Sequence, residues 1–205
     1  EKGANLVISH HPIVFKGLKS FTGKNYVERT VMKAIRNNIA IYAIHTNLDN
    51  VELGVNNKIA KKIGLVNCSV LAPKSNLLTK LYTFCPSEHA ERVRASLFSV
   101  GAGSIGAYDE CSFNVSGTGT FRAGESTNPY VGDKGIQHKE SETKIEVIFP
   151  SHISSQVVSK LLESHPYEEV AYDLVSLNNV FNKVGSGMIG ELEVPVDALD
   201  FLKSL

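Results

Sequence analysis

Three histidines and an aspartate directly follow two short apolar strands near the start of the chain. His10 and His11 come after the first strand, and His45 and Asp49 come after the second. In open α/β sheets, ligands bind beyond the carboxyl ends of the strands, so we expect both groups at the same edge. Imidazole nitrogens and carboxylate oxygens together suit zinc, iron or manganese. The spacing therefore favours a metal site over four unrelated surface residues.

The chemistry expected of such a site is hydrolysis. Two neighbouring histidines can bind two different ions because their side chains diverge, and an aspartate can bind one ion or bridge both. Two ions about 3.5–4 Å apart would supply hydroxide and polarise an oxygen of the substrate. His45 is a candidate proton carrier, because histidine changes charge near neutral pH. A single histidine at a strand end is more often a cap or a surface residue, so the interpretation depends on the convergence of both groups.

Composition narrows the class of protein. The chain has 205 residues, of which 42% are hydrophobic and 20% charged, as in ordinary globular proteins. Lysine and arginine equal aspartate and glutamate at 21 each, so constitutive nucleic-acid binding is disfavoured. The apolar runs are shorter than the roughly 20 residues that span a bilayer, and three cysteines make no disulfide framework. We expect a cytoplasmic protein.

Because the chain opens on Glu1 and closes in a helix that is just beginning, we interpret it as an internal piece of a longer protein.

Residues 1–73 alternate strands with amphipathic helices, which is typical of parallel βαβ units. A helix over about 25–37 has an apolar stripe that ends at Ile35, and a helix over about 51–63 should bury Val55 and Ile59. Residues 179–205 return to strand-like alternation. We interpret 1–73 and 179–205 as two parts of one α/β host domain with a mostly parallel sheet.

Residues 78–178 contain an internal duplication. Lys80–Ser87 aligns without a gap over Lys144–Ser151, and Ala107-Tyr-Asp109 then falls on Ala171-Tyr-Asp173. The repeated unit is a strand, a Pro-Ser pair with serine as the expected helix N-cap, an apolar helix stripe and a second strand. Two such units on one sheet make an inserted α+β ferredoxin-like module.

A glycine-rich stretch, 117–135, separates the two copies. It has neither the third glycine of a dinucleotide fingerprint nor the Gly-Lys-Ser/Thr ending of a P-loop. We therefore predict a long structural loop in preference to a phosphate-binding loop.

The chain resembles the Nif-three-like dinuclear-metal family, whose bacterial members are often labelled GTP cyclohydrolase I type 2 homologues. Four motifs carry the resemblance, and they are Ile8-Ser-His-His-Pro-Ile-Val-Phe15, Ala43-Ile-His-Thr-Asn-Leu-Asp49, His165-Pro-Tyr-Glu-Glu-Val-Ala-Tyr-Asp173 and Gly185-Ser-Gly-Met-Ile-Gly190. The resemblance is to the longer subgroup, in which a PII-like or ferredoxin-like module is inserted into the host domain.

The resemblance implies two divalent metal ions held by His10, His11 and Asp49, with His45 lining the site. It also implies a homohexamer whose metal centres face an internal cavity. Family members complete the site with a C-terminal histidine and glutamate that this sequence does not contain. Two functions stay open at this point: a metal-dependent hydrolase, and a non-enzymatic oligomeric protein that binds a metal or a metabolite in a regulatory or scaffolding role.

Overall fold

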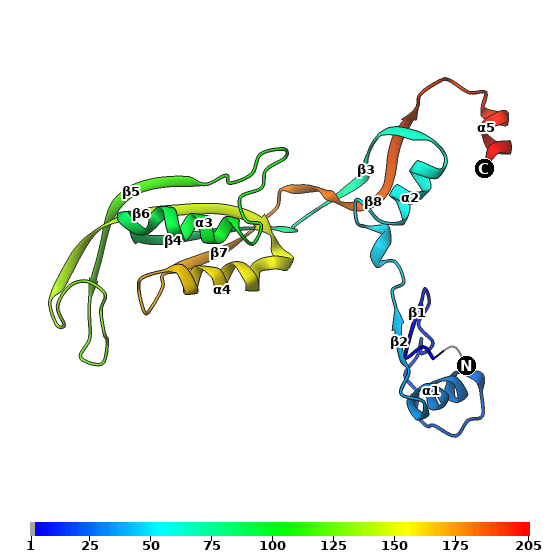
Figure 1. Cartoon of the computed structure of the whole chain (residues 1–205), viewed down its shortest axis with the longest axis horizontal. Helices are drawn as coiled ribbons and strands as arrows, with labels where there is room; N and C mark the ends of the chain where they lie inside the picture. Colours follow the sequence, from blue (N-terminus) through cyan, green and yellow to red (C-terminus); the bar gives the residue numbers. More distant parts are fainter. Residues whose placement is uncertain (1–2) are drawn as a thin grey trace. The chain divides into compact units, whose positions relative to one another are not determined.

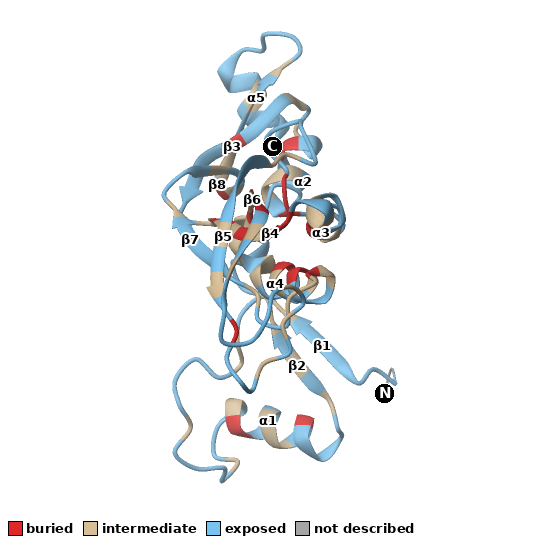
Figure 2. Ribbon diagram, turned by 90° about the vertical axis from the view of Figure 1, so that its left-hand side faces the viewer, coloured by how far each residue is buried: buried red, intermediate tan, exposed pale blue. Residues whose placement is uncertain are grey.

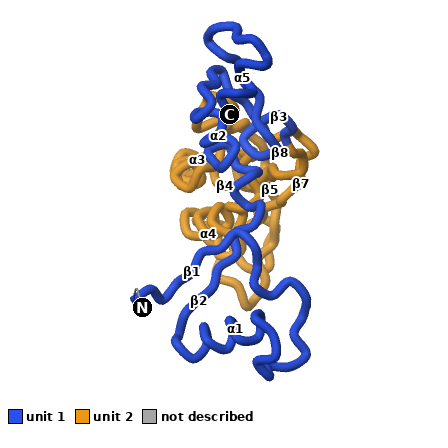
Figure 3. Tube along the Cα trace, turned by 90° about the vertical axis from the view of Figure 1, so that its right-hand side faces the viewer, with its two compact units in different colours: residues 1–73, 182–205 blue, residues 74–181 orange. Residues whose placement is uncertain are grey.

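The computed structural model describes residues 3–205. The chain forms two compact units: residues 1–73 with 182–205, and residues 74–181 (Figure 3). Figure 1 labels the helices and strands along the sequence. No helix in the described range is long and apolar enough to cross a membrane.

The first unit opens with two paired parallel strands. Strand β1 (Leu6–Ser9) pairs in parallel with β2 (Ala40–Ala43), and helix α1 (Tyr26–Arg36) connects them. The Asn25 side chain accepts from the Glu28 N–H at 2.9 Å, and its own amide donates to Glu28 at 2.9 Å. This reciprocal arrangement satisfies a free donor at the helix start. It explains why α1 begins where the sequence predicts.

The remainder of this unit contains a short turn, two helices and a second strand pair. Its elements in chain order are η1 (Asn47–Asp49), α2 (Val55–Lys62), β3 (Leu65–Ser75), β8 (Val180–Leu192) and α5 (Ala198–Ser204). Strands β3 and β8 form their own two-stranded sheet. The expectation of a mostly parallel sheet is therefore not supported, because β1 and β2 make a separate pair. Residue alternation predicts that a segment is extended, but it does not specify which strand it pairs with.

The predicted apolar helix stripes of this unit are only partly buried. Ile35 of α1 is 65% exposed, and Ile59 of α2 is 51% exposed, whereas the smaller Ala34 and Ala60 are buried. Helix α2 also begins later than expected, because Gly54 occupies its N-cap position. A side-chain carbon at residue 54 would collide with the Leu48 carbonyl, so glycine is required at this turn.

The second unit is a split β-α-β module. Its elements are β4 (Leu78–Pro86), η2 (Ser87–His89), α3 (Ala90–Phe98), β5 (Phe113–Arg122), β6 (Gln137–Pro150), η3 (Ser151–Ile153), α4 (Ser154–Ser164) and β7 (Tyr172–Leu177). The strand order is β5-β6-β4-β7, and every neighbouring pair is antiparallel. Each strand–helix–strand unit thus encloses a strand of the other unit. This interleaving is the ferredoxin-like arrangement that the duplication predicts.

The core of the module lies between its sheet and its two helices (Figure 2). Equivalent residues of the two copies are fully buried in it: Val93 and Leu97 on α3, and Val157 and Leu161 on α4. They pack against Leu81, Cys85, Ile145, Val147 and Phe149 of the central strands. Every member of this core cluster comes from the module itself.

The prediction that the two Pro-Ser serines cap helices is wrong. Ser87 and Ser151 each begin a short 3-10 turn, and the helices start three residues later. Their hydroxyls contact neighbouring strands instead, with Ser151 Oγ 2.8 Å from Thr79 Oγ1 and Ser87 Oγ 3.1 Å from Thr143 Oγ1. The duplicated serines join the turn to the sheet.

The glycine-rich stretch is only partly a loop. Its first residues belong to β5, which extends to Arg122 beside β6, and a connection of irregular structure follows before β6 begins at Gln137. Gly119 lies within this strand. A side-chain carbon there would collide with the carboxylate of Glu142 on β6, so glycine makes room for that group.

Candidate metal centre

The pairing of β1 with β2 continues past the strand ends and aligns the histidine segments. The Ile44 N–H donates to the Ser9 carbonyl at 2.9 Å, and the His45 N–H donates to the His10 carbonyl at 2.8 Å. Because parallel strands end at the same edge, this ladder places His45 beside His10. The backbone therefore determines the proximity of the two groups.

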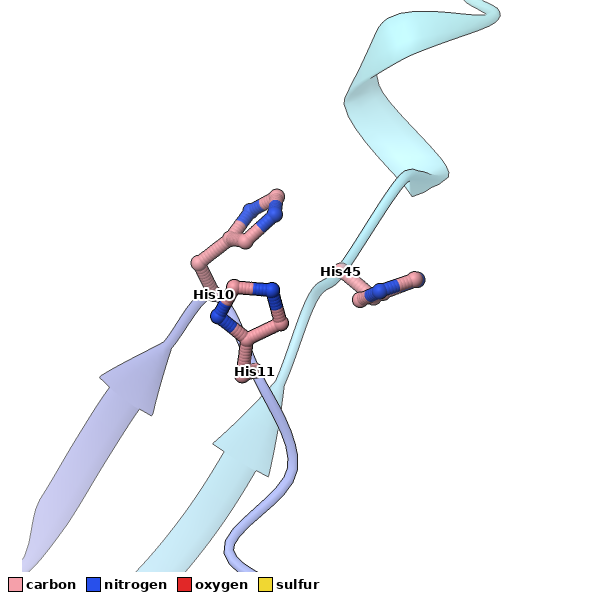
Figure 4. A group of neighbouring side chains, drawn as sticks. All are labelled: His10, His11 and His45. Atoms are coloured by element: carbon pink, nitrogen blue, oxygen red, sulfur yellow. The ribbon is translucent and has the colours of Figure 1, made fainter. Parts of the chain in front are cut away.

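The three imidazoles are neighbours at this edge (Figure 4). Ring centroids lie 4.6 Å apart for His10 and His11, 5.3 Å for His10 and His45, and 5.6 Å for His11 and His45. His45 has a φ of 42°, in the left-handed region, which turns the chain directly after β2. The Ser9 hydroxyl donates to the His11 carbonyl at 2.9 Å and so connects the two ends of the first turn.

The histidine donors fit a divalent ion. One nitrogen from each ring lies within 4.8 Å of the others. Two nitrogens bound tetrahedrally to zinc at about 2.05 Å are separated by roughly 3.4 Å, so small side-chain rotations would bring this group to a binding geometry. All three histidines are exposed, which leaves the edge accessible to water and to a ligand.

Asp49 lies apart from this group. It ends the turn η1, four residues after His45, and its carboxylate is not among the atoms that converge with the imidazoles. Its backbone carbonyl accepts from Asn56 Nδ2 of α2 at 2.7 Å. The structure thus brings together three of the four predicted residues and places the aspartate on the adjoining turn.

The turn that carries Asp49 is attached to strand β8, a link that sequence reasoning missed. Asn50 accepts the Gly185 N–H at 2.8 Å through its carbonyl, and its side-chain oxygen lies 3.1 Å from Ser186 Oγ. A side-chain carbon at Gly185 would collide with the Ala72 carbonyl of β3. The Gly185–Gly190 motif was the available signal, since glycine in a strand marks a close approach of backbones.

The fold and the histidine edge define a class of protein. One unit of the chain is a module of duplicated split β-α-β topology, and the other carries a histidine cluster at the ends of two parallel strands. The sequence profile of the family described as Duf34/NIF3 (NGG1p interacting factor 3) matches residues 1–205. The chain belongs to the Duf34/NIF3 family.

Two relatives described as GTP cyclohydrolase 1 type 2 homolog show the extent of the similarity. The protein of Halalkalibacterium halodurans is 43% identical over 206 residues, which cover 100% of this chain and 55% of that protein. The protein of Bacillus subtilis is 37% identical over 202 residues, which cover 98% of this chain and 54% of that protein. The chain thus spans about half the length of these relatives.

Solved structures give the same result. A Bacillus cereus protein described as related to NIF3 is 40% identical and superposes with a TM-score of 0.82, covering 98% of this chain and 53% of that one. A Staphylococcus aureus protein is 28% identical, with a TM-score of 0.56, and covers 96% of this chain and 50% of that one.

Proposed function

We propose that the protein of which this chain is a part is a hydrolase with a dinuclear divalent metal centre. The observation that supports the proposal most directly is the convergence of His10, His11 and His45 at one strand edge, with one nitrogen of each ring within 4.8 Å of the others. In this proposal His10, His11 and Asp49 are metal ligands, and His45 lines the site. The metal is zinc, iron or manganese, the ions that suit this mixture of donors.

The residues of the chain have distinct tasks in this proposal. The backbone ladder between β1 and β2 fixes the main chain of His10 and His45 before any ion binds, which lowers the cost of assembling the site. Bound divalent ions would supply Lewis acidity and activate water for attack on the substrate. His45 would exchange protons with solvent at the exposed edge. The contacts from Asn50 to Gly185 and Ser186 hold the turn that carries Asp49.

Elemental analysis of the full-length protein tests the metal site. We expect about two divalent ions per subunit, and a loss of metal in His10→Ala, His11→Ala and Asp49→Ala, because losing one ligand of a shared pair weakens both ions. His152→Ala is the matched control, since this exposed histidine lies in the inserted module. Unchanged stoichiometry in all three variants would rule out the site.

Turnover assays then separate the hydrolase from a non-enzymatic metal-binding protein. The relatives described as GTP cyclohydrolase 1 type 2 homolog direct the substrate panel to GTP and other nucleotides. We expect metal-dependent release of product that is lost in His10→Ala. Full metal occupancy without turnover on any nucleotide would favour a regulatory or scaffolding role.

We also propose that the whole protein assembles as a homohexamer. Within the described residues, the outer strands of the module's sheet, β5 and β7, pair on one side only. Several of their apolar side chains are exposed, including Phe113, Val115 and Leu174. Exposed strand edges in natural proteins are usually protected, and self-association is one way to cover them.

A further inference from the structure

The inserted module contains a hollow that the metal-centre proposal does not use. Its volume is about 320 Å³, at the lower end of the range typical of small-molecule sites. It is lined by the end of β5, the connection that follows it, β6 and the segment between α4 and β7. The residues that matter for its chemistry are Phe121, Arg122, Tyr130, Glu142, Tyr167, Glu168 and Glu169.

A buried carboxylate lies in the wall of this pocket. Glu142 is only 9% exposed, and its Oε1 accepts a hydrogen bond from the Tyr167 hydroxyl at 2.8 Å. Within residues 3–205, its Oε2 accepts no hydrogen bond. This oxygen is not among the fully buried atoms left without a partner in the described residues, so it is accessible from the pocket and can accept a hydrogen bond from a ligand. The absence of a side chain at Gly119 provides the space that the carboxylate occupies.

Aromatic rings surround the same space. The Tyr167 ring lies 6.1 Å from Phe121 and 6.2 Å from Tyr130, measured between centroids. The Tyr130 hydroxyl is further held by His89, whose Nε2 lies 2.9 Å away. Aromatic faces bind the apolar part of a ligand and attract cations through their quadrupoles.

The charges of the lining favour a cation. Three carboxylates, Glu142, Glu168 and Glu169, and one guanidinium, Arg122, line the pocket. Glu168 already accepts from the Asn128 N–H at 2.8 Å. An anion would meet the carboxylate of Glu142 with like charge, whereas an ammonium group would pair with it and donate a charge-assisted hydrogen bond to it.

We propose that this pocket binds a small organic amine, with the ammonium group on Glu142 and the apolar body against Phe121, Tyr130 and Tyr167. Two groups near Glu142, Cys85 and Tyr167, have raised pKa values. Burial is the main cause for both, and the carboxylate of Glu142 adds to it. The pKa of the Cys85 thiol is raised to about 11, and that of the Tyr167 phenol is raised further above its ordinary value.

Three probes of matched shape test the proposal by calorimetry on the full-length protein: 2-phenylethylamine, 2-phenylethanol and 3-phenylpropanoate. We expect the amine to bind at least about tenfold more tightly than the alcohol, the size of a charge-assisted hydrogen bond, and the acid not to bind. Equal affinity for all three, or no binding of the amine, would overturn the proposal.

Two variants and two controls identify the group responsible. Glu142→Gln keeps the shape and should remove the preference for the amine, and Gly119→Ala should weaken amine binding by displacing the carboxylate. Glu125→Gln removes an exposed carboxylate from the same connection without touching the pocket and should bind as the native protein does. His10→Ala should leave amine binding unchanged, so failure of the metal centre and failure of this site are distinguishable.

Light scattering addresses the competing occupant, a lysine or arginine of a second copy. If Glu142→Gln lowers the subunit number and the native protein does not bind the amine, the pocket is an assembly contact and the proposal is wrong. If the subunit number is unchanged and only amine affinity falls, the proposal is supported.

Discussion

His165 shows how tertiary contacts determine the state of a single side chain. It is buried, its Nε2 lies 2.9 Å from the Phe84 carbonyl, and its Nδ1 accepts the Tyr167 N–H at 3.1 Å. A ring that accepts at Nδ1 and donates from Nε2 is neutral. Burial, opposed by the hydrogen bond to Phe84, lowers the pKa of His165. Despite its place in a family motif, this histidine joins the end of α4 to β4.

The lowered pKa of His165 predicts a dependence of stability on pH. The unfolded chain takes up a proton below about pH 6.5, the ordinary value, before the folded chain does. The contribution is therefore complete above about pH 6.5 and is lost as the pH falls through the folded pKa. We expect the melting temperature of the native chain to fall more between pH 7.5 and 5 than that of His165→Asn, which does not titrate.

The control for this prediction is His152→Asn, an exposed histidine of the same module. It should keep the native slope of melting temperature against pH. Identical slopes for the native chain and His165→Asn would show that His165 does not contribute to the dependence.

At the scale of elements, the two module helices depend on one apolar stripe each. Leu161 of α4 is fully buried, whereas its neighbour Leu162 is 48% exposed. The two side chains are chemically identical and adjacent in the same helix. Because both leucines have the same helix propensity, a difference between their variants reports the effect of burial alone.

Truncation of these two leucines should have very different effects. We expect Leu161→Ala to lower the free energy of unfolding by about 2–5 kcal/mol, because it removes buried methyl groups and leaves a cavity. Leu162→Ala should change it by less than about 1 kcal/mol, since half of that side chain already contacts water. Urea denaturation followed by circular dichroism measures both, and equal losses would contradict the assigned core.

At the scale of the whole molecule, the inserted module has the contents of an independent domain. Its core residues all lie between Leu81 and Val170, within the unit 74–181. Its four strands pair only with one another in the described part of the chain. The module is thus expected to need no contact with the host unit to bury its core.

Expression of residues 74–181 alone should give a folded protein with one cooperative thermal transition. Light scattering on the same piece and on the full-length protein tests the proposed role in assembly. A full-length protein with the module deleted should have fewer subunits and unchanged metal content. A non-cooperative melt of the isolated module would disprove its autonomy.

Much of this architecture was predictable from the residues. The alignment of Lys80–Ser87 with Lys144–Ser151 predicted the ferredoxin-like module, because two similar strand–helix–strand units can interleave in one sheet. Asn25, followed three residues later by Glu28, is a local pattern that marks the N-terminus of α1. These features depend on residues that are close together in the sequence, so the sequence alone is enough to predict them.

Other features were decided by the tertiary structure alone. Ser87 and Ser151 look like helix caps, but strands distant in sequence bind their hydroxyls. The partners of β1, β2, β3 and β8 follow from long-range packing, so the mostly parallel sheet could not be judged from periodicity. His10, His11 and His45 were recognisable by type, but only the ladder between β1 and β2 brought their rings together. Tyr167 lies in a family motif and Gly119 in the glycine-rich stretch, but neither pattern indicated that they meet Glu142, because a pocket exists only where separate segments meet in space.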